Sequence, residues 1–218
     1  MKENRKNIKW VLVGVLLFCF TLIAIFLVID KIHVLDNFVY GLISKCISPN
    51  ITKFFKLITE LANPITTIIV VLIVCYMLGI KEKDKRGVIE FCLCIGIIAI
   101  LNFVLKNIFT RTRPELINMI TETGYSFPSG HSALSMAVYG YIIYLVNTRC
   151  SNKTLKIVSS IFLGIAIILV GTSRIYLGVH YASDVLAAFM LSLSYVIIYT
   201  HVIKVIRSKK KENDVTKM

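Results

Sequence analysis

The chain has 218 residues, 56% of them apolar, and a formal net charge of +13; its mean hydropathy is +0.77. A soluble domain of this size rarely has such a composition, and several apolar runs approach or exceed the ~18 residues that cross a bilayer. Most basic residues lie in short segments between these runs, which is typical of membrane proteins and argues against a nucleic-acid partner. We therefore expect a single integral-membrane domain spanning residues 1–218.

Six apolar runs predict an all-α fold, a polytopic membrane helix bundle with six transmembrane helices. The first run, roughly residues 9–29, follows a basic start but is longer than the apolar core of a signal peptide and lacks a cleavage site, so we expect it to be retained. Segment 30–63 mixes aromatic and basic residues, which predicts one or two short amphipathic helices in the membrane interface between the first two spans. The other spans are expected at about residues 65–79, 87–105, 131–146, 155–176 and 181–205.

Six spans place both termini on one side of the membrane. With a cytoplasmic amino terminus, the cytoplasmic segments hold 17 of the 25 Lys and Arg residues, in agreement with the positive-inside rule. We therefore predict a plasma-membrane protein with both termini in the cytoplasm and the polar loop 106–130 on the extracytoplasmic face. The six cysteines have no zinc-site spacing, and we interpret them as small apolar packing residues.

A pair of cations lies at the outer end of the third span, where Lys106 is followed seven residues later by Arg113 and Pro114. Two neighbouring cations repel each other unless an anion lies between them, and an ammonium with a bidentate guanidinium suits a phosphate. Considered alone, the pair is equally compatible with cations that only anchor a helix in the interface.

The run Pro128–His131 (PSGH) opens the fourth span. Ser129 can cap the helix, Gly130 lets the backbone approach a ligand, and the free N–H groups of a helix start bind anions. A well-capped helix would explain Ser129 and Gly130 without any ligand. His131, one of only four histidines in the chain, points to chemistry instead.

A third group joins the fifth and sixth spans, where Ser173 and Arg174 precede His180 and Asp184. His180 and Asp184 are four residues apart, which on a helix places them on one face. A carboxylate bonded to one ring nitrogen fixes the tautomer and leaves the other nitrogen as a nucleophile or base. A structural His–Asp cap at a helix start is the alternative for this pair.

The predicted topology brings the three groups together, because each of them falls at the outer end of a span. One pocket would then contain three cations, two histidines, one aspartate and a helix amino terminus. Such a set suits phosphoryl transfer by electrostatic stabilisation and a covalent nucleophile.

Together these residues resemble, at every motif position, the three signature motifs of the type 2 phosphatidic acid phosphatase (PAP2) family. The resemblance implies a metal-independent phosphatase without a cofactor, in which His180 attacks phosphorus to form a phosphohistidine and Asp184 orients His180. It also implies that His131 protonates the leaving oxygen and then helps to activate water. The residues that it implies for holding the phosphate oxygens are Lys106, Arg113, Arg174, Ser129 and Gly130.

The expected partners are a lipid phosphate or diphosphate substrate and membrane lipids, with the oligomeric state left open. Small six-helix members of the resembled family act on undecaprenyl diphosphate, phosphatidylglycerophosphate or phosphatidic acid. We favour undecaprenyl diphosphate, because an outward-facing site suits the recycling of a carrier released on that face. A lipid phosphotransferase and a non-enzymatic lipid-phosphate carrier are the alternatives; six spans argue against the vanadium haloperoxidases and soluble acid phosphatases that resemble the same motifs.

Other polar residues have less informative positions. His33 and His201 lie near span ends and are expected to be interfacial rather than catalytic. Asn102 lies one turn before Lys106, where it either supports that lysine or only packs. Three loop residues either shape specificity or are merely solvated: Glu115, Glu122 and Tyr125.

Overall fold

The structure is a computed structural model that describes residues 2–114 and 119–216, so Glu115 lies outside the described residues. The described part is helical, as predicted. Its helices are α1 (Lys2–Val28), α2 (His33–Ile43), α3 (Pro49–Thr59), α4 (Pro64–Tyr76), α5 (Lys85–Phe109), α6 (Gly130–Arg149), α7 (Lys153–Tyr176) and α8 (Ala182–Thr216). Short 3-10 turns follow α2 and α3, and a π-helical turn, Met77–Lys81, extends α4.

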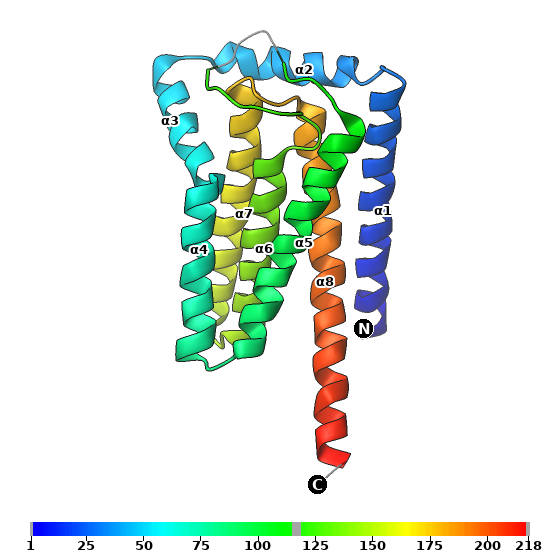
Figure 1. Cartoon of the computed structure of the whole chain (residues 1–218), viewed down its shortest axis with the longest axis vertical. Helices are drawn as coiled ribbons and strands as arrows, with labels where there is room; N and C mark the ends of the chain where they lie inside the picture. Colours follow the sequence, from blue (N-terminus) through cyan, green and yellow to red (C-terminus); the bar gives the residue numbers. More distant parts are fainter. Residues whose placement is uncertain (1, 115–118, 217–218) are drawn as a thin grey trace.

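The long helices run side by side and alternate in direction along the chain (Figure 1). The start of α1 and the end of α8 lie at the same end of the bundle, while α2 lies across the opposite end. The helix α3 then leads from α2 into α4. The short helices expected within segment 30–63 are therefore α2 and α3, and α2 has the crosswise orientation of an interfacial helix.

Five helices of the described chain are long and apolar enough to cross a membrane, namely α1, α4 with its π turn, α5, α7 and α8. Their outer faces expose large apolar side chains: Phe18 is 63% exposed, Phe103 68% and Phe162 69%. Such contiguous apolar surface is unstable in water but is expected where lipid covers it. The protein is therefore a membrane protein.

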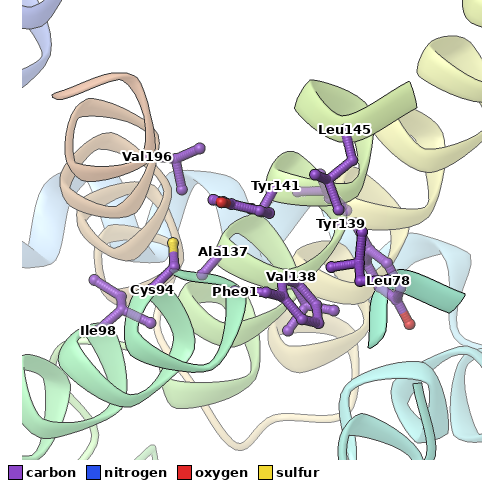
Figure 2. Packing of buried hydrophobic residues seen from close by; sticks show 11 residues of the cluster. Leu78, Phe91, Cys94, Ile98, Ala137, Val138, Tyr139, Tyr141, Leu145 and Val196 are labelled. Carbon is purple, nitrogen blue, oxygen red and sulfur yellow. The ribbon is translucent and has the colours of Figure 1, made fainter. Parts of the chain in front are cut away.

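The fourth predicted span, α6, is not among these five helices, and its packing gives the structural reason. It packs against α4, α5, α7 and α8, so its serine and tyrosine side chains face other helices rather than lipid. Figure 2 shows the core around it, where Ala137, Val138 and Tyr141 of α6 meet Phe91 of α5 and Val196 of α8.

The boundaries of α5 determine whether Lys106 lies in the helix or in the loop after it. The side chain of Asp84 caps the helix by accepting the Gly87 N–H at 2.8 Å, and the helix ends at Phe109, before Thr110, whose φ is +46°. The sequence predicted an end near residue 105, with Lys106 in the following loop. In the structure Lys106 lies in the last turn of α5, because the helix continues to Phe109.

Candidate active site

The three motif segments meet at the end of the bundle that α2 crosses (Figure 1). The end of α5, the start of α6, the end of α7 and the start of α8 all lie there. The Ser129 N–H donates to the Asp184 carbonyl oxygen at 3.1 Å, and the Asn102 side chain donates to the Pro128 carbonyl oxygen at 3.3 Å. Asn102 thus supports the site by tying α5 to the start of α6.

His180 and Asp184 form a buried pair. Asp184 Oδ2 lies 3.3 Å from His180 Nδ1 and accepts the Tyr181 N–H at 3.0 Å. The sequence placed the pair on one helix, but α8 begins at Ala182, so His180 lies in the turn before it. Burial lowers the pKa of His180 to about 4, although Asp184 acts in the opposite direction. The ring is therefore neutral at neutral pH.

Lys106 and Arg113 approach this pair from α5 and from the loop that follows it. Lys106 Nζ donates to two carbonyl oxygens of the loop, those of residues 125 and 126. Arg113 Nη1 lies 3.2 Å from His180 Nε2 and donates to the Val179 carbonyl oxygen at 2.9 Å. Because carbonyl oxygens carry no net charge, these hydrogen bonds do not neutralise either cation, and an anion can still do so.

Arg174 is almost fully buried, with an exposed fraction of 1%. Its Nη1 donates to Thr59 Oγ1 at 2.6 Å, and its Nη2 forms an ion pair with Glu122. Glu122 Oε2 also lies 3.8 Å from Arg113 Nη2, so this carboxylate lies between two guanidinium groups, as a phosphate oxygen would. Burial opposes ionisation of Glu122, but Arg174, together with His131 and Arg113, outweighs burial and holds the pKa of Glu122 below its usual value. Glu122 is therefore part of the site rather than a solvated loop residue.

The start of α6 contributes backbone N–H groups. Ser129 is buried and caps the helix, since its Oγ accepts the Ser132 N–H at 3.4 Å. A Cβ on Gly130 would be in van der Waals contact with Asn102 Oδ1, at 3.4 Å, so the start of α6 lies against α5. The unpaired N–H groups of this first turn carry partial positive charge.

The four histidines divide into two that belong to the site and two that do not. His131, in the first turn of α6, interacts electrostatically with His180, Arg174 and Glu122. His33 pairs instead with the exposed Asp30 at 2.7 Å. The His201 ring packs edge-on against Trp10, at a centroid distance of 5.0 Å.

Comparison with known proteins identifies the family. Residues 87–207, more than half of the chain, match the PAP2 superfamily. This chain belongs to the PAP2 superfamily. The family expected from the three motifs is thereby confirmed, whereas the roles of the individual site residues stay predictions.

Among curated proteins, this PAP2 chain is similar to Phosphatidylglycerophosphatase B of Bacillus subtilis (strain 168), with 42% identity over 103 residues. The match covers 46% of this chain and 50% of that relative, so the chain spans about half the length of the curated relative it matches.

Two solved structures are similar to this PAP2 chain. The first is described as the first transmembrane PAP2 type phosphatidylglycerolphosphate phosphatase from Bacillus subtilis; the TM-score is 0.82 at 28% identity, covering 89% of this chain and 96% of that one. The second is Aquifex aeolicus LpxE, with a TM-score of 0.60 at 24% identity, covering 77% and 95% of the two chains. The first match confirms the predicted fold of a transmembrane helix bundle, and the second shows likeness of fold alone.

Sequence reasoning missed two charged residues of this PAP2 site, Arg111 and Asp36. Arg111 Nη1 donates to Asp184 Oδ1 at 2.6 Å, and Arg111 Nη2 donates to Asp36 Oδ2 at 2.6 Å. Arg111 lies in the polar loop 106–130 without belonging to any of the three motifs, and Asp36 lies in the segment interpreted as an interfacial helix. The one available signal was a lone acidic residue within an otherwise aromatic and apolar run, which is costly to bury without a partner.

Proposed function

We propose that this protein is a membrane phosphatase that removes a phosphate from a lipid phosphate or diphosphate, with His180 as the nucleophile. The buried His180–Asp184 pair carries the proposal: Asp184 occupies Nδ1 at 3.3 Å, and Nε2 lies 3.2 Å from Arg113 Nη1. A neutral ring with its proton on Nδ1 presents the Nε2 lone pair where the guanidinium would hold a phosphate.

The proposed reaction has two displacements. In the first, His180 Nε2 bonds to phosphorus, the bond from phosphorus to the lipid oxygen breaks, and His131, whose imidazolium the bound phosphate anion stabilises, gives its proton to that oxygen. In the second, neutral His131 takes a proton from a water molecule that attacks phosphorus, and the N–P bond breaks. Asp184 stabilises the positive ring of the phosphohistidine in between.

Three side chains supply the positive charge that the transition state needs: Lys106, Arg113 and Arg174. Arg174 Nε is buried and has no partner among the described residues, so it is a donor free to bind a phosphate oxygen. The ion pair between Glu122 and Arg174 must loosen when a phosphate takes its place.

These cations support the prediction that no metal is required. Activity should survive a strong chelator, and vanadate should inhibit because it mimics pentacoordinate phosphorus. Loss of activity in chelator that added magnesium restores would contradict the prediction.

The position of the site supports a lipid substrate. Its residues lie at helix ends rather than at mid-span, so a phosphate could reach them at headgroup depth while the chain stays in the bilayer. The relatives named as phosphatidylglycerophosphate phosphatases make phosphatidylglycerophosphate the first substrate to test. Undecaprenyl diphosphate, which the sequence favoured from the location of the site, stays a prediction.

A phosphate-release panel with the purified protein in detergent tests this proposal. It compares phosphatidylglycerophosphate, phosphatidic acid, undecaprenyl diphosphate and a soluble phosphomonoester. We expect efficient release from at least one lipid, and loss of release in His180→Ala but not in His201→Ala, whose ring lies against Trp10.

Three further outcomes of the panel would each contradict part of the proposal. Higher catalytic efficiency with the soluble ester would contradict a lipid substrate. Tight binding of a lipid phosphate without release would indicate a carrier. Transfer to an added alcohol that exceeds transfer to water would indicate a phosphotransferase.

A further inference from the structure

A buried ionic network lies behind Asp184, on the side away from the proposed phosphate position. Arg111 is 9% exposed and Asp36 only 2%. The Arg111 guanidinium joins the two carboxylates at 2.6 Å each, through Nη1 to Asp184 and Nη2 to Asp36. It also lies 3.8 Å above the Tyr181 ring centroid, a cation–π contact that restrains the plane of the guanidinium.

Ser183 completes the network and connects it to two helices. Its N–H donates to Asp36 Oδ1 at 2.8 Å, and its hydroxyl lies 2.9 Å from Asp36 Oδ2. Arg111 Nη1 also donates to Ser183 Oγ at 2.8 Å. Since Asp36 belongs to α2 and Ser183 to the first turn of α8, the network fixes α2 against the helix that carries Asp184.

The network leaves Asp184 little freedom to turn. Its Oδ1 accepts from Arg111 at 2.6 Å, while its Oδ2 accepts the Tyr181 N–H at 3.0 Å and faces His180 Nδ1 at 3.3 Å. A carboxylate fixed at both oxygens stays ionised and holds the imidazole in one tautomer and one orientation.

We infer that Arg111, anchored by Asp36 of α2, is a positioning residue that fixes Asp184 and thereby aims His180 Nε2 at the phosphate. The inference rests on the proposed role of His180. A misplacement of about 1 Å in such an arrangement can reduce the rate roughly 100-fold. Arg111 touches neither the nucleophile nor the phosphate position; its effect passes through Asp184.

The charge of Arg111 also affects the titration of His180. Removing the guanidinium leaves Asp184 less compensated, which stabilises the imidazolium, so the nucleophile becomes protonated at a higher pH. The charged and titratable groups that interact with His180 are Asp184, Arg113, Arg174 and His131. Around them, from α5, the loop and α2, lie Lys106, Glu122, Arg111 and Asp36. A substitution of Arg111 leaves all the other groups in place, so a shift in the pH profile would report the loss of the Arg111 charge.

The test compares Arg111→Gln, Arg111→Lys and Asp36→Asn with the wild type, for kcat, KM and the pH profile. For Arg111→Gln we expect kcat to fall about 100-fold with little change in KM, and the acidic limb of kcat/KM to rise by about one pH unit. Arg111→Lys keeps a cation near Asp184, so its acidic limb should stay at the wild-type position and part of kcat should return. Asp36→Asn should lower kcat without raising the acidic limb, because Arg111 then compensates Asp184 more fully.

Asp30→Asn is the matched control, since Asp30 precedes α2 and pairs with His33 but is 85% exposed; it should behave as wild type. If all three network variants melt at lower temperature while the folded protein keeps wild-type kcat and acidic limb, the network is only structural and the inference is overturned. If His180→Ala retains activity, the proposed nucleophile is wrong instead. The two failures are therefore distinguishable.

Discussion

Single residues of the site already have anionic or carbonyl partners that a phosphate would replace. Glu122 bridges Arg174 and Arg113, and loop carbonyl oxygens hold Lys106. Since an unpaired cation at this depth would be costly, these contacts keep the site folded without a substrate. A bound phosphate offers more negative charge than one carboxylate, so it can displace Glu122 from the two guanidinium groups.

The environment of His180 predicts an unusual pH dependence. Burial lowers the pKa of His180 to about 4, and the ring must be unprotonated to attack. Because its pKa is lowered, His180 stays unprotonated and active in acid, where an ordinary histidine of pKa about 6.5 would be protonated. After correction for ionisation of the substrate phosphate, kcat/KM should stay constant as the pH is lowered to about 5. An acidic limb near pH 6.5 would show that His180 is not shielded in this way.

Short spacing patterns in the sequence predicted contacts between site residues that lie close together along the chain. The four-residue spacing predicted that His180 and Asp184 would touch, and they do, although His180 precedes α8. The pairing of Asp36 with Ser183 was not predictable in this way, because the two are 147 residues apart. A contact of that kind depends on how α2 docks, which no local spacing encodes.

At the scale of elements, α2 covers the proposed active site. Val39 and Ile43 of α2 pack against Ile175 and Val185, next to the ionic network. A small cavity of about 40 Å³ lies between α2 and His180. The amphipathic pattern of segment 30–63 predicted an interfacial helix, but its position over the site follows from tertiary packing.

The packing of α7 on α8 depends on a glycine. A Cβ on Gly171 would lie 2.8 Å from Val185 Cγ1 and would also collide with the Phe189 ring. Gly171→Ala should therefore destabilise the protein by about 1–3 kcal/mol, measured as a lower melting temperature in detergent. On the same helix, a Cβ on Gly164 meets nothing within 4 Å, so Gly164→Ala should be neutral or stabilising by up to about 1 kcal/mol. Equal effects of the two variants would argue against this contact.

At the scale of the whole molecule, the two ends of the bundle differ in chemistry. One end carries the site and α2, and the other carries both chain termini (Figure 1). At the second end, Arg149 and Arg207 are bound by Asp84 and Glu90. The bias of 17 of 25 basic residues to the segments of this end favours a cytoplasmic location for it.

Two native cysteines report this orientation. Cys46 is exposed and ends the turn between α2 and α3, while Cys150 follows α6 at the opposite end. A membrane-impermeant thiol reagent should label Cys46 in intact cells and Cys150 only after lysis. Cys46→Ser and Cys150→Ser are the matched controls that assign each label. Labelling of Cys150 alone in intact cells would reverse the orientation.

The central claim is that His180 carries the phosphate during turnover. The most direct measurement is rapid acid-free quenching of the His131→Ala variant with a lipid diphosphate, whose lipid-phosphate leaving group needs no proton from His131, followed by mass spectrometry of the peptide that contains residue 180. Without His131 to activate water, the phosphoenzyme should accumulate, and we expect one acid-labile phosphate on His180. Wild-type protein that releases phosphate while neither it nor the variant ever carries phosphate on His180 would contradict the account.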